Sequence, residues 1–101
     1  MPVTLTITST KPANSQFFGE VSEENNQIIK TFNEEIRALP GCVSNVMVVV
    51  DDNTRIFNIV FDTVENYANY HEVRTSKLGW SERQEYNLAN GIVTQVTETI
   101  G

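Results

Sequence analysis

The chain has very few of the residues that most often build redox and metal sites. Its 101 residues include one cysteine, Cys42, and one histidine, His71. One cysteine cannot form a disulfide within the chain, and one Cys with one His cannot complete a tetrahedral zinc site. This cysteine usage favours a reducing compartment, and we expect a cytoplasmic protein.

Positive charge is also scarce, with 7 Lys and Arg against 13 Asp and Glu and a net charge of −6. No run of basic residues forms a stripe that would attract a phosphate backbone or an anionic membrane surface. The longest apolar run, Val46–Val50, is far too short to cross a bilayer. The N-terminal segment lacks the charged start and the apolar core of a signal peptide. We therefore expect neither a nucleic-acid partner nor a membrane.

The length and composition are those of one globular domain covering residues 1–101. The chain is 40% hydrophobic and 20% charged, which is ordinary for a folded protein. A domain this small leaves a large share of its surface exposed when it folds alone, so self-association is expected.

Hydrophobic periodicity divides the chain into seven elements. Strict alternation from Val3 to Thr10 predicts a strand, and Ser22 is placed to cap a helix that ends before Pro40 and Gly41. Further strands are predicted at 42–50, 55–61 and 92–100. Further helices are predicted at 62–78, capped by Asp62 or Thr63, and after Gly79, with Ser81 and Gln84 at capping-box spacing. The order β-α-β-β-α-α-β is that of an α+β, ferredoxin-like split β-α-β fold with a four-stranded antiparallel sheet.

The predicted hairpin is apolar on both faces. If Val50 lies opposite Arg55, one face carries Val46, Val48 and Val50 together with Phe57, Ile59 and Phe61. The opposite face then carries Val43, Met47, Val49, Ile56 and Val60, interrupted by Asn45 and Asn58. A sheet with one wet face would alternate apolar and polar residues instead. Because the fold places the helices on one face only, we expect a second copy to cover the other face as a two-fold homodimer, with the two asparagines in contact across the interface.

With these elements the chain resembles the dimeric α+β barrel superfamily, which includes antibiotic-biosynthesis-monooxygenase-like and stress-responsive barrel proteins. The resemblance rests on the element order, on the segment "LPGCVS", on the hairpin "VMVVVDDNTRIFNIVFD" and on the helix segment "NYANYHEVR". It implies a cavity between sheet and helices that holds small hydrophobic molecules, and it implies that any oxygenase activity needs no metal and no organic cofactor.

His71 is the first candidate for a functional side chain. Its spacing from Val64, Tyr67 and Ala68 predicts that it points toward the sheet. Histidine is the natural proton carrier at neutral pH, so His71 is a candidate catalytic residue. The alternative is a structural histidine that donates one hydrogen bond, and the sequence shows no partner carboxylate that would decide the question.

Aromatic and basic residues complete the candidate site. The predicted ligand-binding residues are Phe17, Phe18, Phe32, Tyr67, His71, Arg74, Trp80 and Tyr86. Aromatic side chains suit an amphipathic ligand, although plain core packing explains Phe32 equally well. Arg74 could bind a carboxylate through a two-pronged contact, and the simpler alternative is pairing with an acid such as Glu65.

These observations lead to one expected function with two alternatives. The first is binding of a mainly apolar molecule, fatty-acid-like or polycyclic, in a cavity between sheet and helices. The second is a cofactor-independent monooxygenase or isomerase in which His71 moves a proton. The third is a structural or regulatory dimer without a ligand. The sequence leaves open whether the chain is an enzyme.

Overall fold

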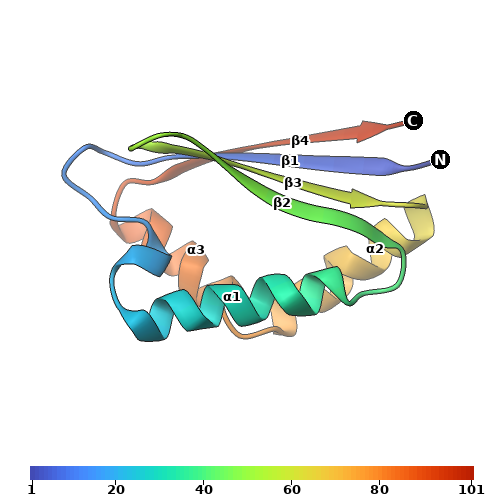
Figure 1. Ribbon diagram of the computed structural model, residues 1–101, viewed down its shortest axis with the longest axis horizontal. Helices are drawn as coiled ribbons and strands as arrows, with labels where there is room; N and C mark the ends of the chain where they lie inside the picture. The colour runs from blue at the N-terminus through green and yellow to red at the C-terminus, as the bar shows by residue number, and fades with distance from the viewer.

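The computed structural model describes residues 1–101, which form a four-stranded antiparallel sheet covered on one face by helices (Figure 1). The strands are β1 (Val3–Thr10), β2 (Cys42–Asp51), β3 (Thr54–Phe61) and β4 (Val93–Ile100). The helices are α1 (Glu23–Arg37), α2 (Val64–Val73) and α3 (Trp80–Ala89), with short 3-10 turns η1 (Phe18–Glu20) and η2 (Arg74–Ser76). The strand order β2-β3-β1-β4 confirms the ferredoxin-like α+β fold.

Two of the predicted helix starts are confirmed. The Ser22 hydroxyl accepts a hydrogen bond from the backbone N–H of Asn25 at 3.1 Å, and the Thr63 hydroxyl accepts one from Asn66 at 3.1 Å. Each cap satisfies one of the free N–H groups at a helix N-terminus.

The third helix start was predicted wrongly. The cap of α3 is Gly79, whose N–H donates to the Glu82 carboxylate at 2.8 Å, and Ser81 lies inside the helix. Gly79 has a φ of +103°, which a residue with a side chain rarely adopts, so the chain turns sharply there. The helix predicted for 62–78 ends at Val73 and continues only as the turn η2.

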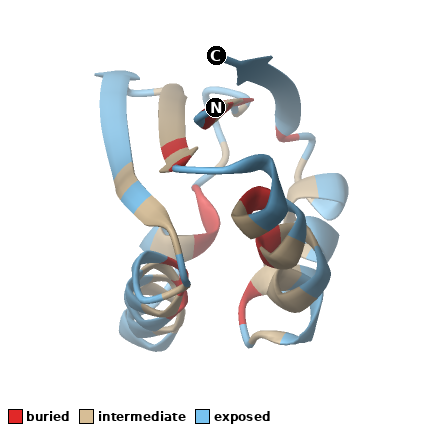
Figure 2. Ribbon diagram, turned by 90° about the vertical axis from the view of Figure 1, so that its right-hand side faces the viewer, coloured by how far each residue is buried: buried red, intermediate tan, exposed pale blue.

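The core lies between the helices and the two central strands, β1 and β3. Its buried members are Val3, Leu5, Phe32, Ile36, Ile59, Phe61, Tyr67 and Tyr70. From α2 the core receives Tyr67 and Tyr70, whereas Val64 and Ala68 are exposed, contrary to the predicted inward face. The edge strand β4, which ends at the C-terminus, is exposed throughout (Figure 2).

The predicted register of the hairpin is wrong by one residue. Asp51 pairs with Thr54 as a tight turn requires, but Val49, not Val50, lies opposite Arg55, because a bulge lies between Val49 and Asp51. Since side chains alternate along a strand, this shift moves the β2 residues before the bulge, from Ser44 to Val49, to the other face.

Asn45 and Met47 therefore lie on the helix side of the sheet. The outer face of the hairpin is formed by Val46, Val48, Ile56, Asn58 and Val60. Asn58 accepts a hydrogen bond from the Thr6 hydroxyl at 3.0 Å, while Asn45 donates to a backbone carbonyl of α1 at 3.5 Å. The predicted contact between Asn45 and Asn58 across an interface is ruled out, because the two lie on opposite faces.

In the observed register, both faces of the hairpin still carry mainly apolar residues. Val46 and Val48 are 54% and 46% exposed on the outer face, where no helix lies. None of the helices is both long and apolar enough to span a membrane.

Candidate functional site

A cavity of about 570 Å³ lies between the helix side of the sheet and the helices. All four strands, all three α-helices and the connector before α1 contribute to its lining of 25 residues, of which 11 are hydrophobic. The hydrophobic ones are Ile7, Phe17, Phe18, Ile29, Phe32, Met47, Phe57, Ile59, Tyr70, Trp80 and Val96. The corrected register explains the presence of Met47 in this list.

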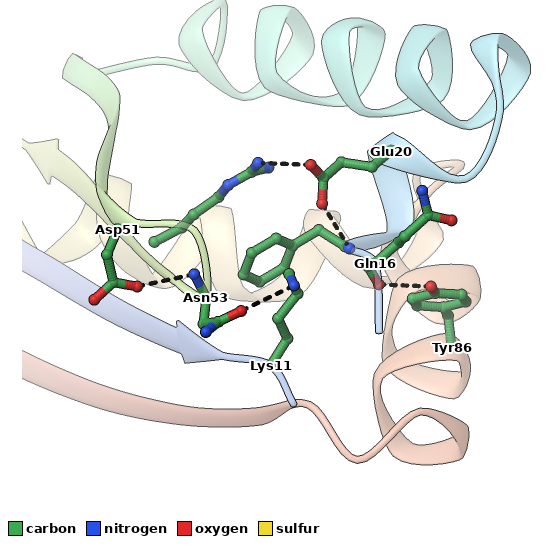
Figure 3. Close-up of polar contacts among 8 residues, drawn as sticks. Lys11, Gln16, Glu20, Asp51, Asn53 and Tyr86 are labelled. Atoms are coloured by element: carbon green, nitrogen blue, oxygen red, sulfur yellow. Dashed lines mark hydrogen bonds and ion pairs between the residues drawn. The ribbon is translucent and has the colours of Figure 1, made fainter. Parts of the chain in front are cut away.

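Six of the eight residues predicted as ligand-binding line this cavity. They are Phe17, Phe18, Phe32, His71, Arg74 and Trp80. The other two, Tyr67 and Tyr86, do not line it. The Tyr86 hydroxyl donates to the backbone carbonyl of Gln16 at 2.6 Å (Figure 3). The Tyr86 ring also meets the Phe18 ring edge to face, so Tyr86 holds the connector against α3.

Phe17 is held over the cavity by charged neighbours. Its backbone N–H donates to the Glu20 carboxylate at 2.9 Å, and Glu20 pairs with Arg55 of β3 at 3.2 Å (Figure 3). The Arg55 guanidinium lies 4.4 Å from the centre of the Phe17 ring, close enough for a cation–π interaction. These contacts hold Phe17, which is buried although it lies in a connector.

Tyr67 joins His71 to a carboxylate. The Tyr67 hydroxyl donates to Glu98 Oε2 at 2.6 Å, and Nε2 of His71 lies 2.7 Å from the Tyr67 oxygen. Because the single hydroxyl proton is directed to Glu98, His71 must carry a proton on Nε2 and donate it to Tyr67. The other ring nitrogen, Nδ1, has no hydrogen-bond partner within the chain and is available as an acceptor.

Burial and nearby charges shift the pKa values of His71 and Tyr67. Burial lowers the pKa of His71, the positive charge of Arg74 lowers it further, and Glu98 acts in the opposite direction. Burial and the hydrogen bond to Glu98 raise the pKa of Tyr67. At neutral pH His71 is therefore neutral and Tyr67 is protonated, so His71 can accept a proton and Tyr67 does not give one up.

Two arginines stand in the cavity wall without an acidic partner. Arg74 lies 4.3 Å from the Trp80 ring and 5.2 Å from the Tyr70 ring, and Arg83 lies 5.4 Å from Phe32 and 5.8 Å from Phe57. Arg74 does not form the ion pair with Glu65 that the sequence left open, and its Nε is buried without a hydrogen-bond partner.

The charged residues of this site that the sequence analysis missed include Glu98, Arg55 and Arg83. Glu98 lies between Val96 and Ile100 on the same side of a predicted strand. A charged residue between two apolar ones was the available signal in the sequence. Its partners lie on another element, so the contact with Tyr67 became visible only with the strand pairing that places Glu98 opposite Leu5. No three His, Cys, Asp or Glu side chains come together in a way that could hold a metal ion.

Comparison with known proteins reveals the fold rather than a family. No family model matches the chain, and no curated protein matches its sequence. Solved structures match over almost the whole chain. SnoaB, a cofactor-independent oxygenase from Streptomyces nogalater, is similar with a TM-score of 0.65 at 12% identity, covering 99% of this chain and 92% of SnoaB.

Two further structures show the same likeness. A candidate antibiotic biosynthesis monooxygenase from Deinococcus radiodurans has a TM-score of 0.66 at 10% identity, covering 98% of this chain and 91% of the other. Its counterpart from Nitrosomonas europaea has a TM-score of 0.60 at 10% identity, covering 98% and 89%. The chain thus has the α+β fold of the antibiotic-biosynthesis-monooxygenase-like proteins, as its sequence predicted. At these identities the likeness shows the fold alone.

Proposed function

We propose that this protein binds a small, mainly apolar molecule, fatty-acid-like or polycyclic, in the cavity between sheet and helices. The observation that carries the proposal is the cavity itself, whose volume of about 570 Å³ is typical of ligand pockets, which run from roughly 300 to 1,000 Å³. Hydrophobic side chains account for 11 of the 25 lining residues, and apart from Gly19 the others are polar or charged. A chain that only built a dimer would be expected to fill this space with its own side chains.

The proposal is tested by blocking the cavity from β4. Val96 lines the cavity and is 59% exposed, and Val93 on the opposite face of the same strand is 61% exposed. We expect Val96→Phe to reduce the amount of organic ligand that copurifies with the protein, measured by solvent extraction and mass spectrometry. Val93→Phe adds the same side chain outside the cavity and should leave the yield unchanged. No extractable ligand in any variant, together with no binding of added apolar probes, would refute the proposal.

A second candidate function is a cofactor-independent oxygenase or isomerase, favoured by the neutral state of His71. His71 lines the cavity, its Nε2 is held by Tyr67, and its Nδ1 is free to take a proton from a bound substrate. Tyr67 and Glu98 would orient the ring, and Glu98 would stabilise the imidazolium that results. The likeness in fold to SnoaB, itself a cofactor-independent oxygenase, supports this candidate.

The two candidates are separated by His71→Ala. If His71 is the base, oxygen uptake with a polycyclic ketone that has an acidic CH₂ group should be lost in the variant while the ketone still binds. If binding is the whole function, neither protein consumes oxygen and the affinity changes only modestly.

We further propose that two copies pack through the outer face of the sheet. The face opposite the helices carries exposed valines and half-buried Ile56 and Val60, and burying each large side chain contributes roughly 1.5–3 kcal/mol. A two-fold homodimer is the simplest way to remove these side chains from water. Sedimentation of the purified protein measures this directly.

A further inference from the structure

The basic residues of this acidic chain are concentrated around the cavity. Of the 7 Lys and Arg residues, four line it: Lys30, Arg55, Arg74 and Arg83. Of the 13 Asp and Glu residues, only Glu20 lines it, and Glu20 is already paired with Arg55. The lining therefore has four positive charges and one negative charge, a formal charge of +3, whereas the whole chain has a net charge of −6.

Arg83 is one of the cavity-lining cations that form no ion pair. It projects from α3 into the cavity wall beside the faces of Phe32 and Phe57, and its side chain makes neither a hydrogen bond nor an ion pair. Burial lowers the pKa of its guanidinium, which nonetheless stays charged because arginine does not lose its proton in proteins. A half-buried charge with no partner is costly, and the aromatic faces offset only part of that cost.

Arg74 repeats the arrangement from the neighbouring turn. Its guanidinium carbon lies 4.3 Å from the centre of the Trp80 ring, its Nε is buried without a hydrogen-bond partner, and it forms no ion pair. Two guanidinium groups that lie over aromatic rings and form no ion pair therefore line one cavity. A planar carboxylate satisfies such donors two at a time.

We propose that the ligand of this cavity is an organic acid: an apolar body that carries a carboxylate, bound by Arg83 and Arg74. The inference rests on the proposed binding function and specifies the chemical class of its ligand. The apolar body lies along Ile7, Phe57 and Ile59 of the sheet, and the carboxylate provides the charge that the two arginines lack. Arg55 takes no part, because Glu20 already neutralises it.

The proposal is tested by calorimetric titration with matched probes at neutral pH, each offered as the free acid anion and as its uncharged methyl ester. A naphthoate represents a polycyclic body and a decanoate represents an aliphatic one. For at least one body, we expect the anion to bind about tenfold or more tightly than the ester, as an added charge-assisted hydrogen bond implies. Raising the salt concentration should lower the affinity for the anion and leave the affinity for the ester unchanged.

Variants assign the effect to the arginines. Arg83→Gln should reduce the affinity for the anion about tenfold while leaving the ester unchanged, and Arg83→Lys should retain part of the preference. Arg37→Gln is the matched control, because Arg37 is the one arginine outside the cavity and is exposed on α1. Thermal unfolding verifies that each variant is folded.

The outcomes distinguish this inference from the function on which it rests. Equal binding of anion and ester, or equal losses of both in Arg83→Gln, overturns the organic-acid inference and leaves apolar binding standing. Binding of neither form of either probe overturns both.

Discussion

Nε2 of His71 lies 2.7 Å from the hydroxyl oxygen of Tyr67, one helical turn earlier on α2. The same hydroxyl donates to Glu98 of β4, so a helix and the far edge strand meet through one oxygen. The contact fixes the orientation and the tautomer of the only histidine in the chain. Three side chains therefore influence the titration of His71: Arg74 and Glu98 through their charges, and Tyr67 through its hydrogen bond.

The two charges should move the pKa of His71 in opposite directions. Glu98→Gln removes the negative charge that raises this pKa, so the pKa should fall further. Arg74→Gln removes the positive charge that lowers it, so the pKa should rise toward the ordinary value. Because the chain has a single histidine, one imidazole proton resonance followed by NMR against pH reports the result. A shift in the same direction for both variants would contradict the geometry, and Arg37→Gln serves as a control with no expected shift.

The same titration makes folding stability depend on pH. The folded pKa of His71 is depressed, so the unfolded chain takes up a proton first as the pH falls below about 6.5. The free energy of unfolding should decrease with falling pH from there down to the folded pKa, and this contribution should be constant above and below that window. Urea denaturation across this range, compared between the wild type and His71→Gln, isolates the effect from carboxylate titrations. A stability difference that does not vary with pH would rule the effect out.

The sequence predicts the elements of this fold better than it predicts the face on which each residue lies. The periodicity of 3–10 and the caps at Ser22 and Thr63 are local signals, and the structure confirms them. The register of β2 could not be predicted in the same way, because Val46–Val50 contains no alternation of apolar and polar residues. A bulge next to Val50 therefore reverses the faces without leaving any trace in the pattern.

The candidate site shows the same division. Phe17, His71 and Trp80 stand out from sequence by residue type and place, and all three line the cavity. In the sequence, Glu98 and Arg83 look like ordinary exposed charges on a strand and a helix. The partner of Glu98 is Tyr67, 31 residues away, and the neighbours of Arg83 are on other elements, so only the folded structure brings them together.

Gly79 should be sensitive to substitution because the start of α3 depends on it. Its φ of +103° disfavours any side chain, and an added Cβ would lie 3.0 Å from Cγ2 of Ile28. We expect Gly79→Ala to lower the free energy of unfolding by about 1–3 kcal/mol, measured by urea denaturation. Gly19→Ala is the matched control: Gly19 has no positive φ, and the nearest atom to an added Cβ is Cγ1 of Ile29 at 3.8 Å. Comparable losses in the two variants would show that the backbone conformation of Gly79 does not matter.

The outer face of the hairpin gives the test of self-association. Val48 is 46% exposed on the side of the sheet that no helix covers, and Val64 is 48% exposed at the start of α2. A glutamate at position 48 would place a charge in the centre of a sheet-to-sheet interface, where desolvation is costly, whereas one at position 64 stays in water and is favourable at a helix N-terminus. Sedimentation velocity should therefore find dimers for the wild type and for Val64→Glu, and single chains for Val48→Glu with an unchanged circular dichroism spectrum. If the wild type sediments as a single chain at high concentration, the outer face is not an interface and its valines are tolerated in water.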